Sequence, residues 1–200
     1  MFKFLIILGL IGLVIYFISR KLSGLTASPS GAIRKGQFLL MHTPTALITK
    51  VSKKTFVNVG IGVILLLIVV LLAVKIKILL FLLPISFYMI GQLFVLTNHV
   101  KAARNQQIWF DPQQEEVIVE SVNKQTIRFK LMTDVKAVQQ VEAVQHTNGV
   151  VFGYYRMKTT AGIVEIPYLV MKNESVDQSF TKAVHKHFSP SVQKRLFPII

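Results

Sequence analysis

Two long apolar runs dominate the first half of the chain, Phe56 to Val74 and Ile78 to Leu96. Each run has 19 residues and no charged side chain, close to the roughly 20 residues that cross a hydrocarbon core. Because backbone groups in lipid must satisfy their own hydrogen bonds, we predict that both runs are transmembrane helices. The connector Lys75-Ile76-Lys77 is so short that the helices must be antiparallel. Residues 56–98 are therefore expected to form a transmembrane helical hairpin.

A third apolar run, Phe4 to Ile18, opens the chain. Arg20 and Lys21 follow it directly, and no clear small-x-small cleavage site comes within the next few residues. We therefore expect residues 1–19 to be a retained transmembrane anchor. The alternative is a cleaved signal peptide, because small residues occur between Leu22 and Gly31.

Basic residues are concentrated beside the apolar runs. All nine acidic residues fall between Asp111 and Asp177, so the first hundred residues hold ten basic side chains and no acidic one. Lys and Arg near span ends are retained in the cytoplasm. We expect residues 20–55, which carry seven of these basic residues, to be a basic cytoplasmic loop. The hairpin tip is then outside and the C-terminal half is cytoplasmic.

The net charge of +14 bears on the choice of partner. Basic residues beside a span are attracted to anionic lipids by about 1 kcal/mol each. Nucleic-acid sites instead combine clustered basic residues with aromatic residues on a surface motif, and the basic residues here are scattered at span ends. We therefore predict the lipid bilayer and other membrane proteins as partners, anionic lipid as a further candidate, and no nucleic acid.

Residues 105–188 are predicted to form a small β-rich domain. Thr126 to Met132 alternates apolar and polar positions, which is typical of a half-buried strand. Asn148-Gly149 favours a hairpin turn, and Pro167 restricts its strand to a sheet edge or a bulge. Six strands are expected, over residues 107–111, 116–122, 126–132, 135–144, 150–159 and 163–170.

A helix is predicted to close this domain. Ser175 and Gln178 have the spacing of a capping box, and the apolar residues that follow have a helical period. The helix should end near Phe188, because Pro190 disfavours helical geometry at the residue before it. Residues 189–200 are expected to be a C-terminal tail with a short basic turn on the membrane surface.

Three short stretches follow the hairpin in order: Ile108-Trp109-Phe110-Asp111, Ile127-Arg128-Phe129-Lys130 and Asp134-Val135-Lys136. With the hairpin before them and the helix after them, they resemble bacterial membrane proteins in which a two-span hairpin precedes a pleckstrin-homology-like (PH-like) domain. The resemblance covers Phe56 to about Phe188. It implies an α+β membrane protein whose transmembrane helices are followed by a small antiparallel β-sandwich or barrel, capped by a C-terminal helix. It also implies a multi-pass protein of the bacterial inner (cytoplasmic) membrane, with a domain that serves as a binding platform.

The sequence offers no catalytic or metal-binding motif. It has no Cys, no glycine-rich phosphate loop and no His-Glu-x-x-His. His185 and His187 are two residues apart on a predicted helix, so their side chains point about 200° from each other and do not share a metal ion. We predict a protein that is not an enzyme and that has no cofactor and no metal.

Two sets of residues are candidates for binding. Arg128, Lys130, Arg156 and Lys158 alternate on predicted strands and could bind lipid headgroups or a partner, although charged residues also solvate the outer face of a sheet. The second set consists of small residues in the apolar runs that allow close helix packing: Gly60, Gly62, Ser86 and Gly91.

These observations favour a non-enzymatic inner-membrane accessory or scaffold protein that holds a PH-like domain at the cytoplasmic face to organise a membrane protein complex. A module that senses anionic lipid is the alternative. A membrane-interface enzyme is the third hypothesis, and no residue stands out as its catalytic group.

Overall fold

The computed structural model describes residues 16, 34–73, 75–121, 126–147, 150–171 and 174–200. The predicted N-terminal anchor, apart from residue 16, lies outside the described residues, as does the part of the predicted loop before residue 34. The Asn148-Gly149 turn lies outside them too, but the residues on either side, Thr147 and Val150, pair as a hairpin would require.

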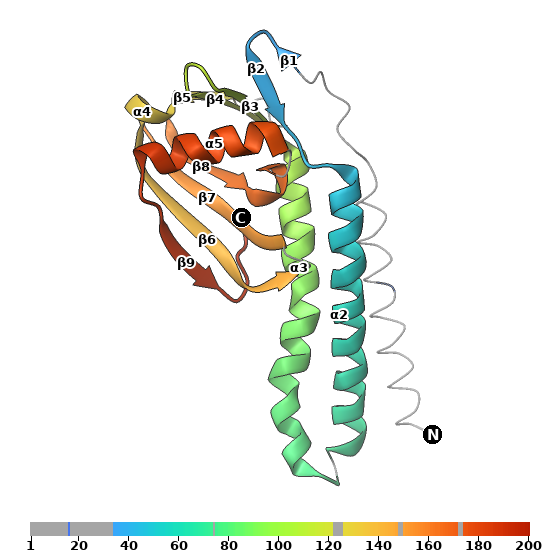
Figure 1. Cartoon of the computed structure of the whole chain (residues 1–200). Coiled ribbons are helices and arrows are strands. Elements are labelled where there is room, and N and C mark those ends of the chain that lie inside the picture. The colour runs from blue at the N-terminus through green and yellow to red at the C-terminus, as the bar shows by residue number, and fades with distance from the viewer. Residues whose placement is uncertain (1–15, 17–33, 74, 122–125, 148–149, 172–173) are drawn as a thin grey trace.

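Two long antiparallel helices form the hairpin. Helix α2 spans Thr45–Leu72, a short 3-10 helix η1 spans Lys77–Leu82, and helix α3 spans Leu83–Asn105 (Figure 1). Thr45–Leu72 and the combined segment Lys77–Asn105 are long and apolar enough to cross a membrane. At 1.5 Å per residue, α2 is about 42 Å long, so about 12 Å of it extends beyond a hydrocarbon core of about 30 Å.

Helix α2 begins eleven residues before the apolar run. Pro44 has an extended backbone, and its carbonyl accepts the amides of Leu47 and Ile48, which starts the first turn. The basic residues at positions 50, 53 and 54 are therefore helical, where the sequence predicted a loop. A hydropathy pattern detects the apolar part of a helix and misses a polar extension of the same helix.

A five-stranded sheet, sheet A, has the order β1-β2-β3-β4-β5, and all its neighbouring strands are antiparallel. Its strands are β1 Arg34–Lys35, β2 Phe38–Met41, β3 Gln106–Asp111, β4 Glu116–Ser121 and β5 Thr126–Lys130. Strand β2 precedes the hairpin and β3 follows it, yet Leu40 pairs with Trp109. The hairpin is therefore inserted into the sheet, and two strands, β1 and β2, lie inside the predicted loop 20–55.

A four-stranded sheet, sheet B, has the order β8-β7-β6-β9. Its strands are β6 Val135–Thr147, β7 Val150–Thr159, β8 Gly162–Pro167 and β9 Ser191–Arg195. Strand β8 lies at the edge of the sheet and ends at Pro167. This agrees with the prediction that Pro167, which has no backbone amide to donate, lies in an edge strand. Strand β9 pairs in parallel with β6, where the sequence predicted a tail with a short turn.

Three short helical segments complete the fold: α4 Leu131–Asp134, η2 Tyr168–Met171 and α5 Glu174–His187. Helix α5 ends one residue before Phe188, close to the predicted end, and lies across the sheets in Figure 1. Its Phe180 ring meets the Phe110 ring edge-on at 5.3 Å. The fold is α+β, as predicted, and among the described residues the two sheets do not close into a barrel.

The hydrophobic core joins both sheets, α5 and the end of the hairpin nearest the domain. Side chains from β3, β7 and α5 share it with six residues of the hairpin: Ile48, Val51, Val95, Leu96, Val100 and Ala103. A domain cut at residue 105 would therefore lose strand β2 and part of its core. The boundary that the sequence predicted there falls inside one structural unit.

Candidate functional site

The most distinctive site is the junction, by which we mean residues 42–44 and 103–107, where the hairpin meets the β domain. Helix α3 ends at Asn105 and β3 begins at Gln106 with no residue between them. On the other side, β2 ends at Met41, and three residues separate it from the start of α2. Because β2 and β3 are paired, the two helices are connected to adjacent strands of sheet A. The direction of the hairpin relative to sheet A is fixed by hydrogen-bonded backbone on both sides.

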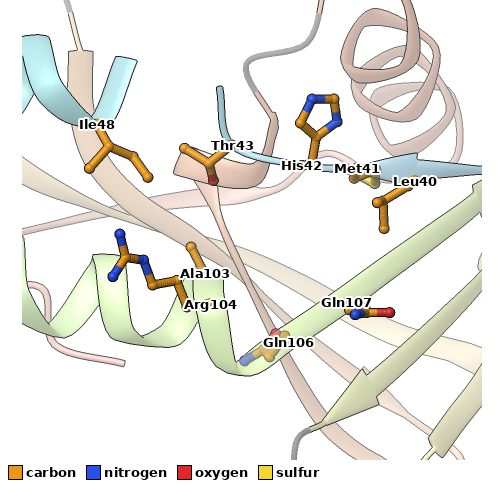
Figure 2. Close-up of a pocket in the computed structure, with 9 residues that line it drawn as sticks. All are labelled: Leu40, Met41, His42, Thr43, Ile48, Ala103, Arg104, Gln106 and Gln107. Carbon is orange, nitrogen blue, oxygen red and sulfur yellow. The ribbon is translucent and has the colours of Figure 1, made fainter. Parts of the chain in front are cut away.

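A small pocket lies at the junction, between the start of α2 and the end of α3. Figure 2 shows the residues that line it: Leu40, Met41, His42, Thr43, Ile48, Ala103, Arg104, Gln106 and Gln107. The cavity volume is about 20 Å³, which is room for one water molecule. Thr43 Oγ1 and Gln106 Oε1 are buried without a hydrogen-bond partner in the protein. The pocket therefore suits a bridging water and is too small for a substrate.

The four predicted basic residues do not form one site. Arg128 and Lys130 lie on β5 of sheet A, whereas Arg156 and Lys158 lie on β7 of sheet B. The sequence showed only that they alternate on strands, and the assignment of those strands to two sheets separates them.

Both guanidinium groups of this set are already paired with carboxylates. Arg128 donates to Glu116 through Nε and a terminal nitrogen, at 2.6 and 2.8 Å, and this pairing lowers the pKa of the Glu116 carboxyl. The Arg128 guanidinium also lies 5.8 Å from the centre of the Phe38 ring. Arg156 donates to Glu165 at 2.9 Å. Each guanidinium would have to leave its carboxylate to bind a phosphate in the same geometry.

The four predicted small residues have three different environments. A Cβ atom on Gly62 would lie 2.7 Å from Cβ of Met89 and 3.1 Å from the carbonyl oxygen of Ser86, so Gly62 and Ser86 lie where α2 and α3 are in close contact. A Cβ atom on Gly91 would lie 2.5 Å from the Phe197 ring. Gly60 has open space around its Cα. Close packing inside the hairpin therefore involves two of the four residues.

Residues 196–200, which we call the C-terminal segment, lie against α3 in an arrangement that the sequence did not reveal. The Asn98 side chain donates to the carbonyl of Ile200 at 3.1 Å and accepts its amide at 2.9 Å. The fully buried His99 lies with Nε2 2.7 Å from the carbonyl oxygen of Pro198. Asn98 and His99 follow the end of an apolar run, and no short-range pattern links them to residues about a hundred positions away.

A polar cleft of about 210 Å³ opens between sheet B and helix α5. Tyr155 accepts a hydrogen bond from Gln140 at 2.7 Å, and Tyr168 donates to Glu142 at 3.3 Å. Burial raises the pKa of both tyrosines. Their hydroxyl groups therefore stay protonated at neutral pH and act as hydrogen-bonding groups, not as bases or nucleophiles.

Comparison with protein-family models, with curated proteins and with solved structures found no match. Within the described residues, no group of three or more His, Cys, Asp or Glu side chains could hold a metal ion. The features that bear on function are therefore the junction, the surface of the hairpin and the distribution of charge.

Proposed function

We propose that the chain is a non-enzymatic accessory or scaffold protein of the bacterial inner membrane. The hairpin spans the bilayer and holds a PH-like β domain at the cytoplasmic face, where the domain organises a complex with other membrane proteins. The antiparallel strands followed by α5 agree with a PH-like arrangement, and the junction supports the scaffold role.

The observation that carries this proposal is the insertion of the hairpin into sheet A. A domain on a flexible linker can rotate and change its height above the membrane, whereas here α3 continues directly into β3 and β2 leads into α2. Val51 and Leu96 of the two helices are 0% exposed and belong to the core of the domain. A fixed height and orientation is what a platform for other membrane subunits requires.

The charge distribution supports the cytoplasmic orientation of the domain. The end of the hairpin next to the domain carries five basic residues: Lys50, Lys53, Lys54, Lys101 and Arg104. The opposite end carries Lys75 and Lys77. Basic residues near span ends are retained on the cytoplasmic side, so the end with the larger number should lie there together with the domain.

A module that senses anionic lipid through Arg128, Lys130, Arg156 and Lys158 ranks second. The two arginines already have carboxylate partners, and the four residues lie on two sheets. A membrane-interface enzyme ranks third, since the polar cleft holds protonated tyrosines and the junction pocket has room for one water molecule.

The test is purification of the tagged full-length protein from its native membranes in a gentle detergent, with mass measurement of the intact assembly. We expect a larger complex of fixed stoichiometry. A matched pair of variants sharpens the test: a Gly-Ser-Gly insertion between Asn105 and Gln106, and the same insertion between Gln113 and Gln114 in the exposed β3–β4 turn.

The junction insertion should lose the partner, because it uncouples the domain from α3, and the turn insertion should keep it. Thermal unfolding of both variants, followed by the fluorescence of Trp109, would show that the domain still folds. Recovery of the unmodified protein as a lone 22.6 kDa chain, or as a homo-oligomer, would contradict the scaffold proposal.

A further inference from the structure

The C-terminal segment lies beside the apolar part of α3. The Phe197 ring contacts Gly91 and lies 5.6 Å from the ring of Tyr88, centre to centre. Gly91 and Tyr88 belong to the apolar run that ends at Leu96. The end of the chain and the end of β9 lie next to α3 in Figure 1, on the side where the hairpin leaves the domain.

The position of this contact along α3 can be compared with the exposed and basic residues of the same helix. Phe94, one turn from Gly91, is largely exposed, so the free surface of α3 is apolar at this level. Lys101 is the first basic residue of α3 beyond it, ten residues after Gly91 and about 15 Å nearer the domain at 1.5 Å per residue. Phe197 therefore contacts α3 at a level where the exposed surface of the helix is apolar, on the hairpin-tip side of Lys101.

The outward side of the same segment is apolar. Leu196 is 59% exposed and Ile199 is 51% exposed. Strand register pairs Ala143 with Arg195, so Val144, which is 50% exposed, lies at the same end of sheet B as Leu196. We call Val144, Leu196, Phe197 and Ile199 the apolar rim.

Side chains satisfy several backbone polar groups of the segment. The carbonyls of residues 198, 199 and 200 accept hydrogen bonds from His99, Tyr154 and Asn98, respectively. Backbone that is not helical is tolerated at membrane depth only where its polar groups are buried in protein or meet water. These three carbonyls, and the amide of Ile200, which donates to Asn98, meet this requirement, although the segment forms neither helix nor strand.

We infer that the apolar rim is a lipid-binding surface: it enters the boundary between headgroups and acyl chains in the leaflet that the domain faces. Lys194 and Arg195, directly before the rim in β9, are then at the height of the phosphates. Lipid is the occupant because the rim continues the exposed apolar surface of α3 at the same depth. This inference depends on the proposed insertion of the hairpin in the membrane.

The test uses spin labels on single cysteines, which need no background substitution because the chain has no Cys. Leu196→Cys and Ile199→Cys report on the rim. Phe87→Cys on the exposed face of α3 is the lipid control, and Met132→Cys on α4, 73% exposed, is the water control. The full-length protein is placed in nanodiscs of phosphatidylcholine and phosphatidylglycerol, and collisions with oxygen and with a water-soluble nickel chelate are measured.

We expect nickel collision rates at both rim labels that are several-fold below that of the Met132 label and between those of the Met132 and Phe87 labels, as for a site at the edge of the apolar layer. The inference is overturned, with the hairpin still in the membrane, if the rim labels match the Met132 label while the Phe87 label is shielded. The proposed insertion itself fails if the Phe87 label also collides freely with nickel. Thermal unfolding of each labelled variant controls for loss of fold.

Discussion

The two ends of the hairpin differ in what their apolar side chains contact. In the upper part, residues 45–56 and 95–105, apolar residues such as Val51 are buried in the domain, and the exposed positions, such as Thr49 and Lys50, are mostly polar. In the lower part, residues 57–94, the exposed positions among the described residues are apolar, such as Ile64 at 59% exposed, except for Lys75 and Lys77 at the tip. One pair of helices therefore has apolar side chains buried in the domain core at one end and exposed on its surface at the other, and the change occurs near residue 56 in α2 and residue 95 in α3.

This contrast shows that burial and hydropathy carry different information. An apolar residue in the upper part contributes to the protein core, whereas an exposed one in the lower part would contact lipid in the proposed membrane-spanning arrangement. Substitutions of similar chemistry in the two parts should therefore have different effects.

The largest difference is expected between Leu96→Ala and Phe94→Ala. Leu96 is fully buried in the core, so its truncation leaves a cavity and should lower the free energy of unfolding by about 2–5 kcal/mol. Phe94 is exposed, and its truncation in lipid should change this free energy little. Denaturant unfolding of the domain, followed by Trp109 fluorescence, measures both. Equal losses for the two variants would contradict the boundary between the parts.

The next effect concerns helix packing in the lower part. Gly62→Ala places a Cβ atom 2.7 Å from Cβ of Met89, which should cost about 1–3 kcal/mol through overpacking. Gly60→Ala is the matched control: its Cβ atom meets open space, so the better helix former should stabilise by about 0.5–1 kcal/mol. Thermal unfolding of the two variants in the same nanodiscs should give shifts of opposite sign. Shifts of the same sign would show that the two helices are not packed through Gly62.

A smaller effect is expected where the C-terminal segment meets α3. Asn98→Ala removes the donor and the acceptor that hold the backbone of Ile200. The loss of a hydrogen bond of about 1 kcal/mol corresponds to roughly fivefold faster amide exchange. Hydrogen–deuterium exchange of residues 196–200 reports it, with Asn105→Ala at the exposed end of α3 as control. Unchanged exchange at residue 200 would argue against the contact.

The smallest effect lies far from the hairpin, at the pair formed by Glu116 and Arg128. Hydrogen bonding by Arg128 lowers the pKa of Glu116 below its value in the unfolded chain, about 4.3. The pair therefore stabilises the domain above that pH, and its contribution is lost as the pH falls through the folded-state pKa. Arg128→Gln should be less stable than the unmodified chain at pH 7, and the difference should shrink as the pH falls below the unfolded-state pKa of Glu116. A stability difference that does not change with pH would exclude the ion pair as its cause.

The sequence predicted the elements whose signal is local. The hairpin is marked by two long uncharged apolar runs, and the six strands from β3 to β8 and helix α5 by apolar patterns and turn or capping residues within a short window; all are present in the structure. Strand β2 has four residues, too few to show a period, and its partner β3 lies on the other side of the hairpin. Strand β9 has four exposed residues of five, so no alternation marks it.

The site was harder to predict than the fold for the same reason. Whether Arg128 and Arg156 share a surface depends on the sheets to which their strands belong, and the contact of Phe197 with Gly91 joins residues more than a hundred positions apart. These pairings depend on the order of the strands in two sheets and on the packing of the C-terminal segment against α3. No short-range pattern along the chain records either.

The most direct test of the contrast between the two parts is labelling of single cysteines by a membrane-impermeant maleimide in sealed inside-out vesicles. We predict rapid labelling of Thr49→Cys, no labelling of Ile61→Cys, Ile64→Cys and Ile68→Cys, and labelling of Lys75→Cys only after the vesicles are opened. Labelling of the three isoleucine positions as fast as Thr49→Cys would contradict the account, because the lower part of the hairpin would then lie in water.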